Sequence, residues 1–135
     1  MKENKITLAH GSGGRLMHEL IDSLRMKFAT KTLDEMADAA EISISKKRIA
    51  FSTDSYVIKP LFFPGGDIGK LAVCGTVNDI SMKGARPLCI SLALILEEGL
   101  EISVLEKIAS SISLTARKAK VKVVTGDLKV VEKGS

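Results

Sequence analysis

The chain has 135 residues, of which 45% are apolar and 27% charged, a balance that fits one folded domain and argues against disorder. Its apolar runs are short and the N-terminus lacks a signal-peptide core, so we expect a cytoplasmic protein without membrane spans. The net charge of +4 accompanies four Phe, one Tyr and no Trp, which argues against a nucleic-acid surface because such surfaces add stacking aromatics to basic patches.

The first predicted element is a helix between Gly14 and Phe28, where apolar residues recur at three- and four-residue spacings. The glycine-rich leader, His10–Gly14, precedes this helix, and Ser12 is a candidate cap. The leader matches neither a P-loop nor Gly-x-Gly-x-x-Gly. Two interpretations stay open: a phosphate-binding segment that uses free backbone N–H groups at a helix start, or a flexible leader with a helix cap.

A β-hairpin is predicted next, after a loop or weak helix over Thr30–Glu41. Ile42 and Ile44 alternate with polar residues, Lys46–Arg48 supplies a charged turn, and Ile49–Val57 alternates again. The following "KPLFFPGG" contains two prolines and a Gly-Gly pair, which predicts a break in regular structure.

The second half of the chain alternates between helix and strand patterns. Asp67 is a plausible cap for a helix to about Lys83, with Gly84 as its stop. The apolar run "PLCISLALILEE" predicts a strand, and a further helix and strand follow at Ile102–Ala116 and Val121–Val124. This order predicts an α+β fold, with a mixed or antiparallel sheet covered by helices on one face.

The two cysteines, Cys74 and Cys89, lie in apolar patterns without a Cys-x-x-Cys motif. We therefore expect two buried reduced thiols and no zinc site.

Three aspartates occupy unusual positions. Asp54 interrupts a strand pattern, Asp79 follows Asn78 within a helix pattern, and Asp127 follows a glycine at which we expect a buried strand to end in a turn. Taken singly, each is typical of a turn or a solvated face. Together they suit a Mg²⁺–nucleotide site, because Mg²⁺ takes one or two carboxylates together with phosphates and water.

Several segments carry a family resemblance: "LAHGSGGRLMHELI", "FSTDSYVIKPLFFPGGDIGKLAVCGTVNDISMKGARPL", "LILEEGL" and "VVTGDLKVVEKG". In this order they resemble the N-terminal half of the HypE family of hydrogenase maturation proteins. The resemblance covers the chain except for the Thr30–Lys47 region. That family is part of an ATP-binding superfamily with aminoimidazole ribonucleotide synthetase, selenophosphate synthetase and thiamine-monophosphate kinase.

The resemblance implies an ATP-dependent carbamoyl dehydratase, a lyase. Such an enzyme uses ATP to dehydrate an S-carbamoyl group on its C-terminal cysteine to a thiocyanate, which supplies the cyanide ligand of [NiFe]-hydrogenase. It also implies ATP and Mg²⁺ as cofactors, HypF as carbamoyl donor, a HypC–HypD complex as cyanide acceptor, and a homodimer whose nucleotide sites form between domains and subunits.

The resemblance further implies two sets of site residues. The implied Mg²⁺ ligands are Asp54, Asp79 and Asp127. The implied ATP-binding residues are His10, Gly11, Ser12, Gly13, Gly14, Asn78 and Lys129, with the leader as a flexible cover over the phosphates that excludes water from the activated intermediate.

The chain departs from the family pattern in two ways. Leu128 stands where the family usually has threonine, so either a hydroxyl contact is lost or the position faces the core. The C-terminal domain and its cysteine tail do not appear in the sequence, so we expect residues 1–135 to form one ATP-binding and dimerisation domain without dehydratase turnover. The alternatives are a non-catalytic docking module for other hydrogenase maturation proteins and a selenophosphate synthetase-like ATP enzyme.

Overall fold

A computed structural model describes residues 5–28 and 49–134. Its elements in chain order are a 3-10 helix η1 (Leu8–Gly11), helix α1 (Arg15–Phe28), strands β1 (Phe62–Phe63) and β2 (Gly66–Asp67), helix α3 (Ile68–Met82), strand β3 (Cys89–Glu97), helix α4 (Ile102–Ala119) and strand β4 (Lys122–Val131). This mixture of helices and strands confirms the expected α+β class.

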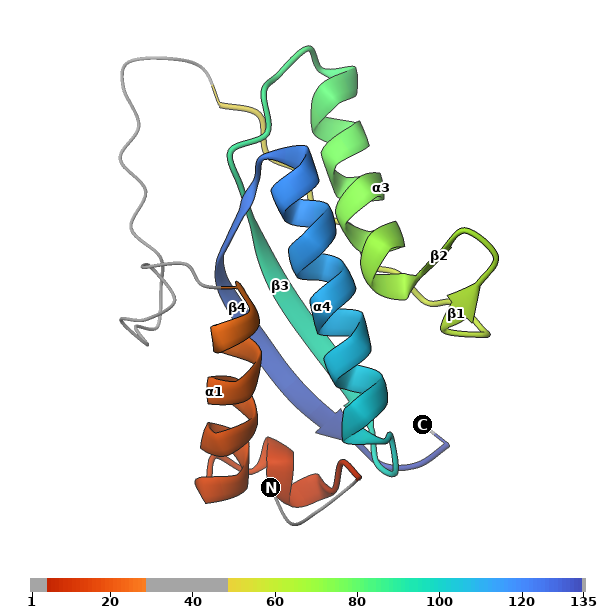
Figure 1. Cartoon of the computed structure of the whole chain (residues 1–135). Helices are drawn as coiled ribbons and strands as arrows, with labels where there is room; N and C mark the ends of the chain where they lie inside the picture. Colours follow the sequence, from red (N-terminus) through yellow and green to blue (C-terminus); the bar gives the residue numbers. More distant parts are fainter. Residues whose placement is uncertain (1–4, 29–48, 135) are drawn as a thin grey trace.

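The main sheet of the described residues is the parallel pair β3–β4, and helix α4 connects its two strands. Figure 1 shows α4 in front of this pair, with α1 and α3 on either side of α4. Helices therefore cover one face of the strands, as expected, and the antiparallel pairing is confined to the small β1–β2 hairpin.

Strand β4 is longer than its sequence pattern indicates. It runs through Gly126 and Asp127, so the expected glycine turn before Asp127 is wrong. Gly126 instead lets the two strands approach each other, because a Cβ built on it would lie 2.4 Å from the carbonyl oxygen of Leu92. The pairing skips one residue of β4 between Ile90 and Ser91, which is a β-bulge.

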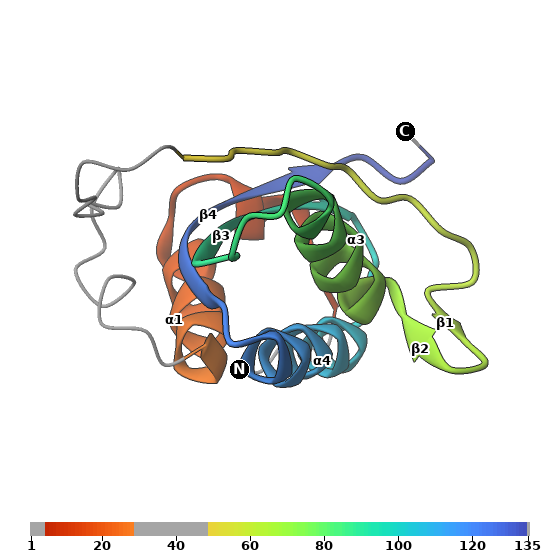
Figure 2. The ribbon, with the colours of Figure 1, turned by 90° about the horizontal axis from the view of Figure 1, so that it is seen from above.

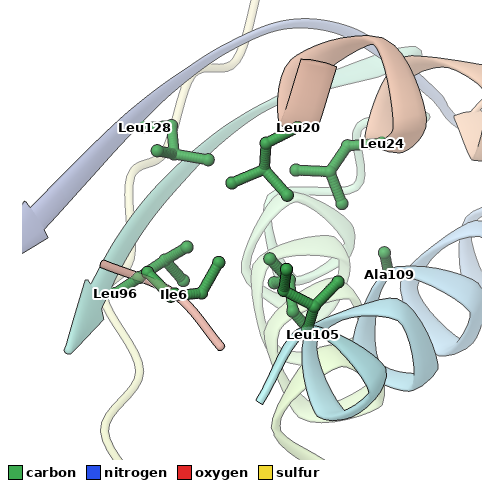
Figure 3. Packing of buried hydrophobic residues seen from close by; sticks show 8 residues of the cluster. Ile6, Leu20, Leu24, Leu96, Leu105, Ala109 and Leu128 are labelled. Atoms are coloured by element: carbon green, nitrogen blue, oxygen red, sulfur yellow. The ribbon is translucent and has the colours of Figure 1, made fainter. Parts of the chain in front are cut away.

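The core between the helices and the strand pair forms from the apolar faces that the sequence predicts. Figure 3 shows side chains from α1, α4, β3 and β4 pointing toward one another. Leu20 and Leu105 are 1% and 2% exposed, and burial of each such side chain contributes roughly 1.5–3 kcal/mol. The buried members of this cluster are Ile6, Leu20, Leu24, Leu96, Ile102, Leu105, Ala109 and Leu128.

A second apolar cluster packs α3 against α4 and the start of β4. Its buried members are Val73, Ile108, Ile112, Ala116, Val121 and Val123. Gly69 sits at the closest point of the two helices, since a Cβ there would lie 2.8 Å from the carbonyl oxygen of Ile108 and from Cγ1 of Ile112.

Helix α3 begins and ends where the sequence predicts. The carboxylate of Asp67 accepts hydrogen bonds from the backbone N–H groups of Gly69 at 2.8 Å and Lys70 at 3.0 Å, which confirms Asp67 as the cap. Gly84 follows the helix with a φ of 67°, a left-handed conformation that glycine adopts without strain.

Segment 49–58 carries no strand in the structure, so the strand predicted over Ile49–Val57 is wrong. The expected alternation is present only in part. Phe51 and Val57 are 88% and 98% exposed, whereas Ser52 and Tyr56 are half-buried. Ala50 and Asp54, which alternation would place on the face of Ser52 and Tyr56, are exposed. In Figure 2 this segment (yellow) lies on the opposite side of the strand pair from α4. The first half of the expected hairpin, Ile42–Arg48, and the loop or weak helix Thr30–Glu41 lie outside the described residues.

Cys74 on α3 and Cys89 on β3 are both half-buried free thiols, and neither has a disulfide partner within the described ranges 5–28 and 49–134. Over the same ranges, no helix combines the length and apolarity needed to cross a bilayer.

Candidate functional site

The leader is anchored to the core by His10, the last but one residue of η1. The His10 side chain is 0% exposed, and its Nδ1 accepts a hydrogen bond of 3.1 Å from the backbone N–H of Thr7, with the Thr7 hydroxyl 3.0 Å from the same nitrogen. Because a backbone N–H can only donate, the proton of the neutral ring lies on Nε2. The imidazole therefore holds the start of the leader against the protein interior.

The rest of the leader differs in exposure. Gly11 packs against β4, since a Cβ built on it would lie 3.0 Å from Val130, whereas Ser12, Gly13 and Gly14 are exposed. Gly13 has a φ of 80°, which requires glycine's conformational freedom.

Ser12 does not cap α1 as expected. Its hydroxyl donates to the carbonyl oxygen of Ala9 at 3.0 Å, which closes the 3-10 turn of η1. Helix α1 begins only at Arg15, and the carbonyl oxygen of Gly14 accepts the first helical hydrogen bond, from the N–H of His18 at 3.2 Å. Ser12 therefore lies too far before the helix to bond its first free N–H groups.

The phenol of Tyr56 links Asp54 to helix α3, which carries Asp79. Tyr56 Oη donates a hydrogen bond of 3.1 Å to Oδ2 of Asp54 and lies 3.5 Å from the hydroxyl of Thr76 on α3. The pKa of Tyr56 is raised above 10.0, first by burial, which disfavours the phenolate, and then by the hydrogen bond and charge of Asp54 and the charge of Asp79, while the bond to Thr76 acts in the opposite direction. We call Asp54, Tyr56, Thr76 and Asp79 the Tyr56 cluster.

Asp79 and Asn78 belong to the last turns of α3, and both are exposed. Asp79 follows Thr76 by three residues, so both side chains lie on the same helix face. The Tyr56 cluster thus presents the carboxylates of Asp54 and Asp79 and the hydroxyl of Thr76, all oxygen donors of the kind that hard divalent cations bind.

Asp127 and Lys129 lie on β4, and their side chains form an exposed ion pair of 3.3 Å. They alternate with Leu128, which is 5% exposed and packs in the core cluster. Leu128 therefore faces the helices, and the threonine of the family pattern would point into the core at this position. Asp127 and Lys129 share the other face of the β3–β4 pair, opposite Ala93 and Ile95 of β3.

The expected site residues thus occupy separate parts of this chain. Figure 1 places η1 at one end of the molecule and the last turn of α3 at the other. Within residues 5–28 and 49–134, no group of three or more His, Cys, Asp or Glu side chains is arranged to hold a metal ion. A single chain therefore brings Asp54 to Tyr56 and, through Tyr56, to the face of α3 that carries Thr76 and Asp79, but it does not gather all three aspartates beneath the leader.

Tyr56 and Thr76 belong to this site, although sequence reasoning did not select them. A signal for Tyr56 exists, because it stands two residues after Asp54 and so shares its face of an extended segment. The contact with α3 has no such signal, since nothing local indicates which helix faces that segment.

Known proteins are similar to this chain in sequence. The family of AIR synthase related proteins, N-terminal domain, matches residues 36–135 of the chain. Carbamoyl dehydratase HypE of Escherichia coli is 52% identical to the chain over 138 aligned residues, which cover 98% of this chain and 41% of that protein. Carbamoyl dehydratase HypE of Rhodobacter capsulatus is 46% identical over 100% of this chain and 41% of its own length.

Solved structures of HypE proteins match this chain in backbone as well as in sequence. A hydrogenase maturation protein HypE in complex with ATP matches 95% of this chain and 38% of its own with a TM-score of 0.92 and 50% sequence identity. A HypE–HypF complex matches 90% of this chain with a TM-score of 0.62 and 49% identity. The chain spans about 41% of the length of the curated relatives it matches.

Proposed function

This chain belongs to the family of AIR synthase related proteins and matches the N-terminal domain of that family. We therefore propose that it is the ATP-binding N-terminal part of a HypE-like carbamoyl dehydratase. The observation that carries this proposal is the close match, in both backbone and sequence, to a HypE whose structure contains ATP. We assign residues 1–135 to a single ATP-binding and dimerisation domain.

The proposed reaction of the whole enzyme is the dehydration of an S-carbamoyl cysteine to a thiocyanate. The carbamoyl oxygen attacks the terminal phosphorus of ATP, ADP departs, and the nitrogen loses one proton. Loss of the resulting phosphate together with the second N–H proton leaves the C≡N group on sulfur. The amide oxygen is a poor leaving group until it is phosphorylated. We assign the carrier cysteine to the part of the full-length relatives that this chain does not span, because Cys74 and Cys89 are half-buried within α3 and β3.

The Tyr56 cluster fits a divalent cation. Its two carboxylates are exposed, and they match the one or two that Mg²⁺ takes together with phosphates and water. Asp54 and Asp79 would hold Mg²⁺, which would neutralise charge on the phosphates when bound, and Asn78 would contact the nucleotide beside them.

The remaining assigned residues lie elsewhere in the chain, so we propose that two copies complete the site. Asp127 would add a third carboxylate to the metal, Lys129 would bind phosphate, and the leader His10–Gly14 would offer backbone N–H groups to the phosphates and exclude water. The separation of η1 from the end of α3 within one chain supports a shared site.

For the full-length protein we propose HypF as carbamoyl donor, a HypC–HypD complex as cyanide acceptor, and the cytoplasm as its location. The likeness to the HypE component of a HypE–HypF complex supports the first of these partners.

Titration calorimetry with Mg-ATP tests the proposed function. We expect the chain to bind Mg-ATP, and Asp79→Ala to bind at least about tenfold more weakly, since even loss of an outer-shell partner of a metal ligand commonly costs that much. Asp22→Ala is the matched control, because Asp22 is exposed on α1 and pairs with Arg25. Absence of binding by the unaltered chain would contradict ATP binding and favour a non-catalytic docking module.

A further inference from the structure

Segment 49–58 is fixed to α3 through the ring of Tyr56. The segment pairs with no strand among the described residues, and its apolar side chains Phe51 and Val57 are almost fully exposed. Tyr56 instead turns toward α3, where its hydroxyl lies 3.5 Å from that of Thr76. The position of Asp54 relative to α3 therefore depends on this aromatic side chain.

The Tyr56 ring packs directly against the backbone of α3 at Gly75. A Cβ built on Gly75 would lie 2.1 Å from Oη of Tyr56, 2.7 Å from Cζ and 2.9 Å from Cε1. Real Cβ atoms do not approach other atoms this closely, so any larger residue at this position would displace the phenol. The absence of a side chain at Gly75 thus sets how near segment 49–58 lies to the helix.

The Tyr56 hydroxyl also orients the carboxylate of Asp54. This hydroxyl donates a hydrogen bond of 3.1 Å to Oδ2 of Asp54 and lies 3.5 Å from the hydroxyl of Thr76, which shares a face of α3 with Asp79. Two carboxylates on the same part of a surface repel each other, and a divalent cation between them offsets that repulsion. A donor hydrogen-bonded to one oxygen of a ligating carboxylate fixes which oxygen faces the cation.

We propose that Tyr56 is a positioning residue that holds Asp54 beside Asp79, so that the two carboxylates bind one divalent cation. This inference rests on the proposed function, since it concerns the cation of the same nucleotide site. Tyr56 acts through Asp54 and does not itself contact the cation. Gly75 also contributes to this positioning, because its lack of a side chain leaves the space that the Tyr56 ring occupies.

Binding of Mn²⁺ to the 135-residue chain, followed by the loss of the free-ion paramagnetic resonance signal with and without ATP, tests this role. Tyr56→Phe keeps the ring and removes only the hydroxyl, so we expect the Mn²⁺ affinity to fall about tenfold or more while the thermal unfolding midpoint changes little. Ser55→Ala is the matched control, because it removes one hydroxyl from the neighbouring exposed residue and should leave the affinity unchanged.

Two further variants separate positioning from a general structural role. Asp54→Asn should weaken Mn²⁺ binding, and Tyr56→Phe should add no further loss in that background, because the phenol acts only through Asp54. Gly75→Ala should weaken Mn²⁺ binding by displacing the ring even though it leaves every oxygen of the cluster in the sequence.

The outcomes distinguish this inference from the proposed function. If the unaltered chain binds Mn²⁺ and Tyr56→Phe binds it equally well, the positioning role is wrong and the proposed function stands. If the losses from Tyr56→Phe and Asp54→Asn add fully, the phenol does not act through Asp54 and the inference is also wrong. If the unaltered chain fails to bind Mn²⁺ even with ATP, the proposed function fails and this inference fails with it.

Discussion

At the residue scale, the phenol of Tyr56 links Asp54, a carboxylate assigned to the metal, to helix α3, which carries Asp79. Tyr56 is the only tyrosine of the chain and there is no tryptophan, so its ionisation is visible in the near-ultraviolet absorbance without interference. Its raised pKa means that the folded state holds the phenolic proton more tightly than the unfolded chain. The resulting stability is present below pH 10.0, the ordinary pKa, and is lost as the pH rises through the folded value.

An alkaline titration of phenolate absorbance therefore has a predicted direction. We expect a midpoint above 10.0 for the unaltered chain and a lower one for Asp54→Asn, which removes a neighbouring negative charge. Asp127→Asn is the control and should not move the midpoint, since Asp127 is not among the groups that act on Tyr56. A midpoint at or below 10.0 in the folded chain would contradict the geometry of the Tyr56 cluster.

A second residue-scale prediction concerns Leu128, which is 5% exposed in the core. Leu128→Thr restores the residue of the family pattern but buries a hydroxyl. Leu128→Val is the reference, because valine has nearly the same shape as threonine and no hydroxyl. The free energy of unfolding should therefore be about 1–3 kcal/mol lower for Leu128→Thr than for Leu128→Val. Urea denaturation measures both. Tighter Mg-ATP binding by Leu128→Thr with no loss of stability would mean that the position faces the nucleotide instead.

At the element scale, α3 and α4 pack through a glycine. On an exposed helix, Gly→Ala stabilises by about 1 kcal/mol. At Gly69 we predict the opposite sign, a loss of about 1–3 kcal/mol, because the added methyl overlaps the carbonyl of Ile108 and the side chain of Ile112. Thermal or urea unfolding decides the sign, with exposed Lys70→Ala as a control of small effect. Stabilisation by Gly69→Ala would show that the two helices do not pack this closely.

The elements also show what the sequence could predict. The helices α1, α3 and α4 and the strand β3 follow from the spacing of apolar residues and from the Asp67 cap, both of which are local signals. The extension of β4 through Gly126 depends on its pairing with Leu92 of β3, which no local pattern contains. Segment 49–58 has the sequence alternation of a strand but no pairing partner among the described residues, so its pattern alone predicted a strand that these residues do not form.

The site follows the same division. Asp54, Asp79 and Asp127 are identifiable by residue type and by resemblance, and the structure links Asp54 through Tyr56 to the helix that carries Asp79. The contact between the Tyr56 ring and Gly75 could not be predicted, because it arises where two segments distant in sequence meet in space.

At the scale of the whole molecule, the outer side of the described fold presents apolar residues to solvent. Phe51 and Val57 on segment 49–58 are 88% and 98% exposed, and Ile95 on β3 is 74% exposed. Such positions are typical of an interface, and the unpaired segment offers backbone groups to a second chain. We therefore expect the homodimer on this side.

Sedimentation at about tens of micromolar should give a dimer for the unaltered chain, since association of this kind depends on protomer concentration. Val57→Ser combined with Ile95→Ser should shift it toward monomer. Met26→Ser is the matched control, because Met26 is also 74% exposed but lies on α1. A monomer for the unaltered chain, or equal dissociation by the control, would contradict an interface at this face.

The most direct test of the central claim, that Asp54 and Asp79 jointly hold the cation of a bound nucleotide, is anomalous X-ray scattering from crystals of the chain grown with Mn²⁺ and ATP. We predict an anomalous peak within bonding distance of both carboxylates, next to density for phosphate. A Mn²⁺ peak bound elsewhere, with both carboxylates free beside an ordered nucleotide, would contradict it.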